Sequence, residues 1–315
     1  MKEIRNVAIV GAGTMGHSLA QVFAQGGHPV RLYSRREETR SNAMRLIASN
    51  LATAAELGIL EKDAPEAVLG RIRTTDRVEE AGEDADFVIE AIVEDVEVKK
   101  NVFKALDDAC PPETILASNT SYLDIFGFLK TSRPDRILIT HWFAPPHIVP
   151  LVEIVPGPET APEIVETVKT LLLGLGKKPM VLKTFLSGFI ANRLQTVLRN
   201  EVLFLLDSGY ATAEQIDEAT KASFGLRLPI LGLVKRMDYT GLDLQQKFLA
   251  NRSTDPSAKA SSETIDKLVS EGKLGVKNGA GFYDYGGRSP EEIMKERDVK
   301  LIKLREFLRE LGELD

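Results

Sequence analysis

Short apolar runs alternate with helix-like stretches over the first half of the chain. Residues 7–10 form one such run, which ends in a glycine, and residues 30–33 form another after a helix-like stretch over 14–25. This order predicts a strand, a helix and a second, parallel strand. Further short apolar runs follow at residues 87–89, 115–117, 137–139 and 152–155. We therefore expect an α/β domain built on a mostly parallel, doubly wound sheet.

Two segments depart from this alternation. Residues 35–73 are rich in Ala, Leu and Glu, which predicts two helices inserted before the third strand as a hairpin that stands off the sheet. From Ser187 onward, helical periodicity replaces the strand-like runs. We predict an α/β domain over residues 1–186 and an all-helical C-terminal domain over residues 187–315, with a hinge at residues 183–188. Ligands commonly bind in the cleft between two such domains.

The predicted helical domain offers apolar surface for self-association. Apolar residues recur at helical spacing at positions 190, 194, 197, 198, 202, 205 and 206, and again at 301, 304, 308 and 311. Either a self-contained helical core or a contact between subunits accounts for them. We expect this domain to bind substrate and to pair in a homodimer, the commonest symmetric assembly of soluble proteins.

Composition and charge narrow the class of protein. The formal net charge is -6, whereas a nucleic-acid binder normally carries a basic stripe that neutralises phosphates. No apolar run reaches the roughly 18 residues of a membrane-spanning helix, and the stretch before residue 7 lacks the apolar core of a signal peptide. The single cysteine, Cys110, has no disulfide partner, which favours a reducing compartment. We expect a cytoplasmic protein with a small-molecule ligand, no metal site, and no nucleic-acid or membrane partner.

A glycine-rich turn joins the first predicted strand to the helix after it. Its sequence is Gly11-Ala12-Gly13-Thr14-Met15-Gly16, and the flanking strand and helix raise it above a chance GxGxxG. Gly11 permits a tight turn, Gly13 lets the backbone approach a pyrophosphate, and Gly16 lets the helix pack close to the strand. The helix N-terminus at Thr14 and Met15 then presents unpaired N–H groups to the phosphates. The pattern predicts a Rossmann-type domain of a nicotinamide-dependent dehydrogenase, with a glycine turn that holds no ligand as the alternative.

The end of the second strand bears on which dinucleotide binds. A domain specific for NAD usually has an Asp or Glu there, which accepts hydrogen bonds from the ribose hydroxyls. Here the strand ends in Tyr33-Ser34-Arg35-Arg36. Ser34 can donate a hydrogen bond to a 2′-phosphate, and Arg35 and Arg36 can neutralise its charge. These residues favour NADP over NAD, unless the arginines are solvated loop charges balanced by the two glutamates that follow.

Polar residues follow several predicted strands, at the edge where an open α/β sheet binds its ligands. His141 ends one strand, and Glu153 interrupts a strand otherwise made of Leu, Val and Ile. A glutamate in an apolar strand needs a partner. A histidine oriented by a buried carboxylate is a good base for the proton that leaves a hydroxyl group during hydride transfer. We therefore expect His141 to be the general base and Glu153 to orient it.

Over nearly its whole length, the sequence resembles the 3-hydroxyacyl-CoA dehydrogenase family, whose relatives include L-gulonate dehydrogenase and lambda-crystallin. The motifs that carry the resemblance are the glycine turn, Glu90-Ala91-Ile92-Val93-Glu94 with Lys99, Ser118-Asn119-Thr120-Ser121, His141 with Pro145, Leu151-Val152-Glu153, Gly188-Phe189-Ile190-Ala191-Asn192-Arg193, Gly241-Leu242-Asp243, and the run from Gly275 to Tyr283. Because so many motifs occur in the same order, the resemblance is specific.

The resemblance implies roles for several of these residues. Ser121 and Asn192 are implied as hydrogen-bonding groups at the substrate oxygen, in addition to His141 and Glu153. Glu94 and Lys99 are implied beside the nicotinamide end of the cofactor, and we expect Asn119 among the cofactor contacts. The implied reaction moves a hydride between the cofactor, with NAD favoured by the family, and the 3-hydroxy group of (S)-3-hydroxyacyl-CoA, hydroxybutyryl-CoA being the leading substrate.

Other features depart from the acyl-CoA pattern. Ala144 stands where those enzymes have an asparagine, residues 46–60 contain no Lys or Arg to meet CoA phosphates, and Lys235-Arg236 follow a Gly-Leu in place of Gly-Pro. An alternative substrate is therefore a small free hydroxy carboxylate or a ring-carboxylate aldehyde, such as gulonate or a pyridine carboxylate from pyridoxate breakdown. A third interpretation, a structural or sensing protein that binds dinucleotide without catalysis, is weakened because all four catalytic residue types are present.

Overall fold

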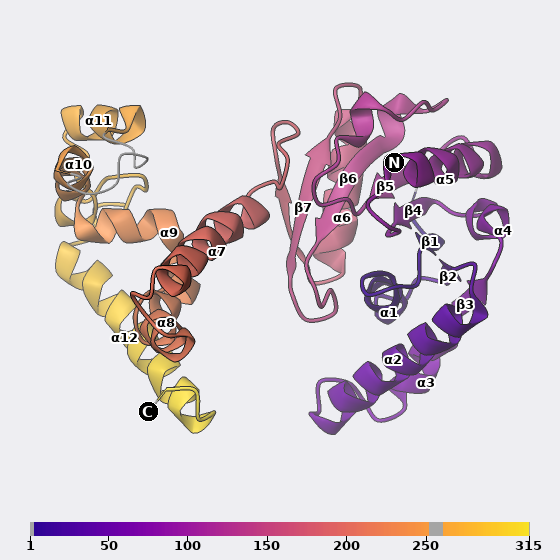
Figure 1. The fold of residues 1–315 in the computed structure, drawn as a ribbon, viewed down its shortest axis with the longest axis horizontal. Coiled ribbons are helices and arrows are strands. Elements are labelled where there is room, and N and C mark those ends of the chain that lie inside the picture. The colour runs from indigo at the N-terminus through magenta and orange to yellow at the C-terminus, as the bar shows by residue number, and fades with distance from the viewer. Residues whose placement is uncertain (1–2, 252–260, 315) are drawn as a thin grey trace. The chain divides into compact units, whose positions relative to one another are not determined.

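Eight strands form one sheet in the computed structural model, which describes residues 3–251 and 261–314 (Figure 1). The strands are β1 (Val7–Val10), β2 (Val30–Tyr33), β3 (Ile72–Thr75), β4 (Phe87–Glu90), β5 (Ile115–Ser118), β6 (Ile137–Trp142), β7 (Leu151–Pro156) and β8 (Lys178–Val181). Their order is β3-β2-β1-β4-β5-β6-β7-β8. Every neighbouring pair is parallel except β6 and β7. The predicted mostly parallel, doubly wound sheet is confirmed, and its carboxyl edge is the expected ligand edge.

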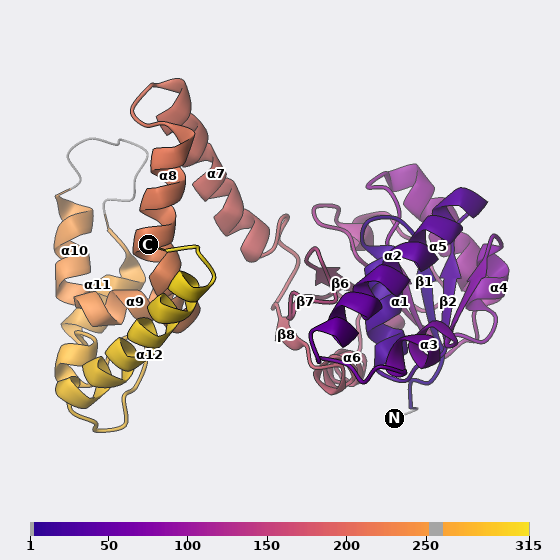
Figure 2. The same ribbon diagram turned by 90° about the horizontal axis from the view of Figure 1, so that it is seen from below.

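Helices cover both faces of this sheet. Successive strand residues point to opposite faces, so the apolar strands present side chains on both faces that must be buried. The helices around the sheet are α1 (Gly16–Gln25), α2 (Glu37–Glu56), α3 (Ala64–Leu69), α4 (Val78–Gly82), α5 (Val96–Ala109) and α6 (Pro162–Gly174). In β1, Val7 and Ile9 pack with residues of α1 and α6, whereas Ala8 and Val10 pack with residues of α4 and α5. Figure 2 shows α1 and α6 on the same side of the sheet. Two apolar cores, one per face, therefore hold the strand ends in place.

The inserted pair of helices between β2 and β3 is present as predicted. Helices α2 and α3 pack against each other and against α1. Ala43, Ile47 and Leu51 of α2 and Val68 of α3 are buried in the same core as α1. The hairpin is thus attached along one face, and only its other face projects from the sheet.

The remainder of the chain is helical. Its elements are α7 (Ala191–Asp207), α8 (Ala213–Thr220), a π turn (Lys221–Gly225), α9 (Leu226–Thr240), α10 (Leu242–Ala250), α11 (Glu263–Ser270), a 3-10 turn (Val276–Asn278) and α12 (Pro290–Glu310). The chain divides into two compact units, Met1–Val197 and Leu198–Asp315, with the boundary inside α7. The domain limits 1–186 and 187–315 stay a prediction. In the described part of the chain, no helix is both long and apolar enough to span a membrane.

A buried aspartate organises the second unit. Asp238 of α9 accepts hydrogen bonds from the backbone N–H groups of Phe282 and Tyr283, at 2.8 and 3.0 Å, and from the hydroxyl of Tyr285 at 3.0 Å. A Cβ on Gly275 or Gly281 would lie 2.1 Å from the Asp238 carbonyl or 2.4 Å from its carboxylate. The family-like motif from Gly275 to Tyr283 is therefore explained by packing against Asp238.

Candidate active site

The glycine turn lies between β1 and α1 and leaves space in front of one glycine. A Cβ on Gly16 would lie 1.6 Å from the Gly11 carbonyl, and one on Gly11 (φ 115°) would lie 2.5 Å from the Ala91 carbonyl. A Cβ on Gly13 would meet nothing within 4 Å. Gly11 and Gly16 are thus required by the protein's own packing, whereas Gly13 keeps open the space in which a pyrophosphate would approach the backbone.

A cleft of about 880 Å³ extends from this turn along the carboxyl ends of β1, β2, β4 and β5. Most of the predicted cofactor residues line it, namely Gly11, Gly13, Thr14, Met15, Ser34, Arg35, Glu94 and Asn119. Helix α1 opens into it with no side-chain cap and no acidic residue in its first turn, so its N-terminal N–H groups are available to an anion. The residues present fit a dinucleotide. Gly16 and Lys99 do not line the cleft.

Lys99 is instead enclosed by carboxylates. Its side chain is 1% exposed, and its Nζ lies 2.7 and 2.8 Å from the two carboxylate oxygens of Glu90 and 3.3 Å from Oε2 of Glu94. Glu90 also accepts hydrogen bonds from the Ser118 hydroxyl at 2.6 Å and the Ile92 N–H at 2.8 Å. The pair therefore connects the ends of β4 and β5 to α5, which is the task of a positioning group.

Glu94 lies at the edge of the same network and faces the cleft. It accepts hydrogen bonds from the Thr120 hydroxyl at 2.5 Å and from the backbone N–H groups of Ser121 and Tyr122 at 2.9 and 3.1 Å. Burial opposes ionisation of this carboxyl, but the Thr120 hydrogen bond, the Lys99 charge and the two N–H donors outweigh it and lower its pKa. An ionised Glu94 thus fixes the segment that carries Ser121, a cleft residue.

His141 and Glu153 face each other across the antiparallel pair β6 and β7, in which they are register partners. The His141 Nδ1 lies 2.9 Å from Oε2 of Glu153, and their side chains are 3% and 1% exposed. An ionised carboxylate can only accept, so the hydrogen lies on Nδ1 and the neutral ring keeps a lone pair on Nε2. The predicted pair is therefore brought together in the geometry that an oriented base requires.

The other oxygen of Glu153 holds the start of α7. Its Oε1 accepts hydrogen bonds from the N–H groups of Ile190 and Ala191, at 2.9 and 3.1 Å. Burial opposes ionisation of Glu153, but the hydrogen bond from His141 and those from Ala191 and Ile190 outweigh it and lower its pKa. Asn192 is the next residue along the helix and is half-buried. Glu153 thus links the predicted base to the segment that carries Asn192.

Two aromatic rings flank the imidazole, and an amide binds the backbone of the next residue. Phe143 and Phe189 lie with their ring centroids 4.6 and 4.9 Å from that of His141. Asn119, which lines the cleft, accepts a hydrogen bond through Oδ1 from the N–H of Trp142 at 2.9 Å. The residue after His141 is therefore hydrogen-bonded to a residue of the cleft, which connects the predicted base to the expected cofactor side.

Glu90 and Thr120 are functional candidates that reasoning from the sequence did not assign. Glu90 ends the apolar strand Phe87–Glu90 and is fully buried, just as Glu153 is in β7. The rule that a carboxylate in an apolar strand needs a partner would have singled it out.

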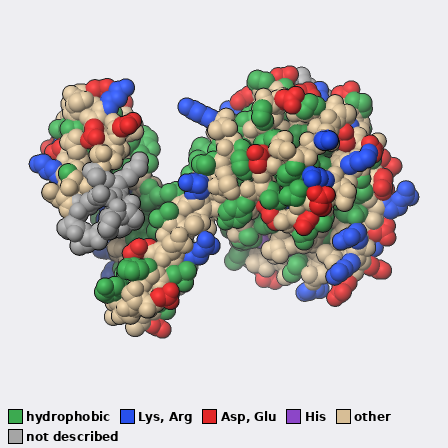
Figure 3. Space-filling model, turned by 45° about the horizontal axis from the view of Figure 1, so that its top comes forward, with side chains coloured by type: hydrophobic (Ala, Val, Ile, Leu, Met, Phe, Trp, Pro, Cys, Tyr) green, Lys and Arg blue, Asp and Glu red, His purple; other side chains and the backbone are tan. Residues whose placement is uncertain are grey.

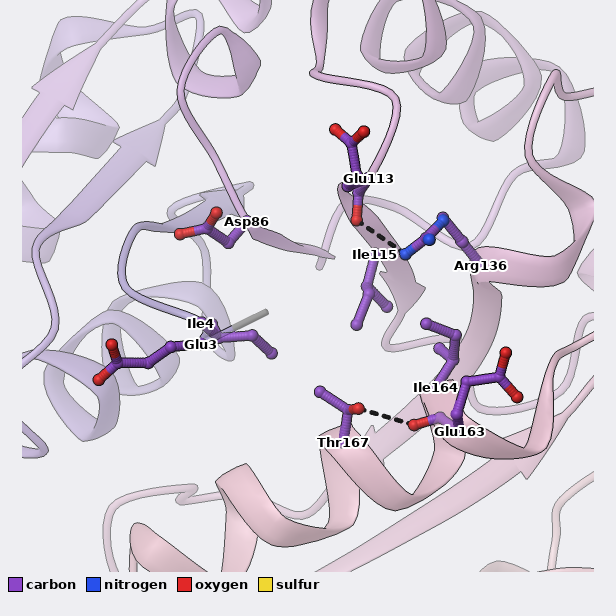
Figure 4. Close-up of a pocket in the computed structure, with 9 residues that line it drawn as sticks. All are labelled: Glu3, Ile4, Asp86, Glu113, Ile115, Arg136, Glu163, Ile164 and Thr167. Carbon is purple, nitrogen blue, oxygen red and sulfur yellow. Dashed lines mark hydrogen bonds between the residues drawn. The ribbon is translucent and has the colours of Figure 1, made fainter. Parts of the chain in front are cut away.

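A second cavity, of about 140 Å³, opens at the opposite edge of the sheet, near the amino ends of β4, β5 and β6 (Figure 4). Four of its nine lining residues are acidic and three are isoleucines, and the Arg136 guanidinium donates to the Glu113 carbonyl at 3.1 Å. Asp86 accepts hydrogen bonds from the N–H groups of Arg5 and Asn6. Ligands of open α/β sheets bind at the carboxyl edge, so this cavity is not the candidate site. No group of three or more His, Cys, Asp or Glu residues within 3–251 and 261–314 is arranged to hold a metal ion.

Comparison with known proteins identifies the family. Residues 6–185 match the model of the 3-hydroxyacyl-CoA dehydrogenase NAD binding domain, and residues 188–285 match the model of the 3-hydroxyacyl-CoA dehydrogenase C-terminal domain. The chain belongs to the 3-hydroxyacyl-CoA dehydrogenase family. It is a dehydrogenase with an NAD-binding domain, and NAD is one of the two predicted cofactors.

Relatives within this family differ in their named substrates. The chain is 36% identical to a probable 3-hydroxybutyryl-CoA dehydrogenase of Bacillus subtilis, over 90% of this chain and 98% of that one. It is 31% identical to the 5-formyl-3-hydroxy-2-methylpyridine 4-carboxylate 5-dehydrogenase of Mesorhizobium japonicum, over 97% and 98%. A solved 3-hydroxyacyl-CoA dehydrogenase of Archaeoglobus fulgidus is 31% identical, with a TM-score of 0.80 over 98% of this chain and 99% of that one.

Proposed function

We propose that this dehydrogenase oxidises a secondary hydroxyl group, and reduces the matching ketone, with His141 as the general acid and base. The observation that carries the proposal is the buried His141–Glu153 pair at the carboxyl edge of the sheet, tied through Trp142 and Asn119 to the dinucleotide cleft. Bound nicotinamide supplies the hydride acceptor or donor. The remaining chemistry is the transfer of one proton, which a single imidazole can perform.

The hydrogen-bond pattern around the imidazole indicates which of its two nitrogens exchanges the proton. The Nε2 of His141 takes the proton of the hydroxyl group, and the ionised Glu153 stabilises the imidazolium that forms. In the reverse direction the same nitrogen returns the proton. Ser121 and Asn192 donate hydrogen bonds that hold the reacting oxygen, and Phe143 and Phe189 exclude water from the ring. Glu94, Lys99 and Asn119 support the cofactor side, with Lys99 acting through the carboxylates that enclose it.

The proposed substrate is an (S)-3-hydroxyacyl-CoA, with 3-hydroxybutyryl-CoA as the first compound to test. Membership of the family and the relative from Bacillus subtilis support it. Reduced cofactor absorbs at a wavelength where oxidised cofactor does not, so its consumption with acetoacetyl-CoA tests the proposal directly. Turnover supports it, whereas cofactor binding without turnover on this or any hydroxy acid contradicts the assignment of His141.

A second candidate substrate is a small hydroxy carboxylate or ring-carboxylate aldehyde. The last ten residues of α2 carry no Lys or Arg, and the relative from Mesorhizobium japonicum acts on a pyridine carboxylate. Without cationic side chains, this stretch offers little to the phosphates of CoA. A panel of free 3-hydroxy acids and pyridine carboxylates beside acetoacetyl-CoA separates the two candidates, because a specific enzyme turns over only one class efficiently.

We also propose that two copies of the chain pair through α7. Apolar side chains along this helix are exposed, none of its residues is buried, and Figure 3 shows hydrophobic side chains at the surface of the helical unit. The exposed residues are Leu194, Val197, Leu198, Leu203, Phe204 and Leu206. A soluble chain that exposes such a row normally covers it with a partner. Light scattering should give twice the chain mass, and Phe204→Glu should give a single chain; a single-chain mass for the unchanged protein contradicts the pairing.

We place the protein in the cytoplasm as a further proposal. Cys110 is a buried free cysteine, and burial raises the pKa of its thiol to about 11. The proposal rests on the absence of a disulfide among the described residues, since free cysteines are typical of a reducing compartment. Fractionation of cells that express the tagged protein tests the location, and its recovery outside the cytoplasm contradicts it.

A further inference from the structure

The end of β2 lies directly beside the glycine turn. The Gly11 N–H donates to the Tyr33 carbonyl at 2.9 Å, and the Ser34 N–H donates to the Thr75 carbonyl of β3 at 3.1 Å. Ser34, Arg35 and Thr39 line the same cleft as Gly13 and Thr14. In a Rossmann-type domain, this place next to the turn receives the ribose that carries the adenine.

Arg35 is the cationic side chain that lines this end of the cleft. Of the cleft residues, Glu94 carries the carboxylate, and it is held by Lys99 and Thr120 at the other end of the cleft. No carboxylate in the described parts of the chain forms an ion pair with Arg35, whose side chain is exposed. Among the residues that line this cleft, a ribose 2′-hydroxyl would therefore find no carboxylate beside Arg35, although the exposed Glu38 lines a neighbouring hollow that shares Thr39. A phosphate would find an arginine with which no described carboxylate forms an ion pair.

A second arginine shapes the turn without entering the cleft. Arg40 of α2 donates through Nη1 to the Ser34 carbonyl at 2.6 Å and to the Arg35 carbonyl at 3.2 Å, and it lies 3.9 Å from the Asp76 carboxylate. These contacts hold the backbone between β2 and α2. Because Arg40 fixes the turn, Ser34 and Arg35 are free to serve a ligand. Arg36 begins α2 as its N-cap and does not line the cleft.

We propose that Ser34, Arg35 and Thr39 form a binding site for the 2′-phosphate of NADP. The chain then accepts NADP at least as well as the NAD that its family description names. Ser34 and Thr39 donate hydroxyl hydrogen bonds to phosphate oxygens, and Arg35 adds a charge-assisted pair. The inference rests on the proposed use of a nicotinamide cofactor, but it concerns binding and does not depend on which substrate is reduced.

Equilibrium titration of the full chain with NADPH and with NADH, followed by cofactor fluorescence and without substrate, tests the site. We expect NADPH to bind at least as tightly as NADH. Arg35→Ala should weaken NADPH binding by about 10- to 100-fold, the usual value of a hydrogen-bonded ion pair, and change NADH binding less than threefold. Ser34→Asp should reverse the preference, since a carboxylate repels the phosphate and accepts hydrogen bonds from the ribose.

Arg73→Ala is the matched control. It removes one exposed arginine from the neighbouring strand β3, outside the cleft, and should leave the binding of both cofactors unchanged. A preference of the unchanged protein for NADH by more than about threefold overturns the proposal, and so does an Arg35→Ala variant that keeps full NADPH affinity. Normal binding of both cofactors with no turnover would instead contradict the proposed function, so the two failures are distinguishable.

Discussion

Two glutamates of this protein are buried in strands of the sheet but are hydrogen-bonded to partners of different chemistry. Glu90 ends β4 and Glu153 lies in β7, and each is fully buried with a basic side chain hydrogen-bonded to it. The partner of Glu90 is Lys99, whose ammonium lies between the carboxylates of Glu90 and Glu94. The partner of Glu153 is an imidazole, which uses one nitrogen for the pair and keeps the other. We therefore propose that the first pair positions the backbone, whereas the second also exchanges a proton.

The largest effect is expected from removing the imidazole. His141→Gln should lower turnover on the order of 10³- to 10⁴-fold, because it removes the proposed acceptor of the hydroxyl proton. NADH affinity should stay within about threefold, since His141 is not among the residues that line the dinucleotide cleft. Steady-state kinetics and cofactor titration on the same preparation measure both. Near-normal turnover would show that the His141–Glu153 pair does not exchange the proton, and that it differs from the Glu90–Lys99 pair less than we propose.

Removing the lysine should affect stability first. Lys99→Met leaves Glu90 buried without its counter-charge, which should reduce the free energy of unfolding by about 3–5 kcal/mol in urea. The double variant Glu90→Gln with Lys99→Met should recover much of the loss, because it leaves no unpaired charge: the amide oxygen can accept from the Ile92 N–H, and the amide NH2 can donate to the Ser118 hydroxyl oxygen. If the double variant were as unstable as the single one, ion pairing would not explain the role of Lys99.

Glu153→Gln should lower turnover about 10²-fold, less than loss of the histidine itself. The amide oxygen can accept from the ring, but the amide NH2 cannot accept from the Ile190 and Ala191 N–H groups, and the neutral amide no longer stabilises the imidazolium. Glu153→Asp is the conservative control and should recover part of the rate if the negative charge matters. Turnover of Glu153→Gln equal to that of the unchanged enzyme would show that the carboxylate has only a packing role.

The smallest effect is expected on the pH dependence of stability. The folded pKa of Glu153 lies below its ordinary value of about 4.3 because donors from His141, Ile190 and Ala191 favour the charged form. Its contribution to stability is thus fully present above pH 4.3 and is lost as the pH falls through the folded pKa. The stability difference between the unchanged chain and Glu153→Gln should shrink between pH 6 and pH 3. A constant difference would contradict the hydrogen-bond pattern.

The same comparison shows what the sequence could and could not predict. His141 and Glu153 were predictable because a glutamate in an apolar strand stands out and both residues adjoin strand ends. The burial of Lys99 was not, because a lysine in the first turn of a helix is normally solvated, and only the packing of α5 brings it to Glu90. Which charged side chains contact one another therefore depends on how the helices and strands pack, and residue type alone does not reveal it.

The fold was predictable where strands are central and apolar, and less so at the sheet edges. β3 and β8 are the two edge strands. β3 carries two exposed polar residues between its buried ends, and most residues of β8 are exposed, so neither has the fully buried apolar pattern of the central strands. The resemblance to a family supplied roles for Ser121 and Asn192 that the pattern alone could not give. The inserted helices were predicted, but their attachment to the α1 core depends on Ala43, Ile47 and Leu51 facing α1.

A single-turnover measurement tests the central claim most directly. His141→Gln saturated with reduced cofactor is mixed with the substrate that the unchanged enzyme turns over, and cofactor absorbance is followed. We predict that the variant binds cofactor normally and transfers hydride at least 10³-fold more slowly than the unchanged enzyme. Lys99→Met, under conditions in which it remains folded, should transfer hydride far faster than His141→Gln. Hydride transfer by His141→Gln at the rate of the unchanged enzyme would contradict the assignment of His141 as the base.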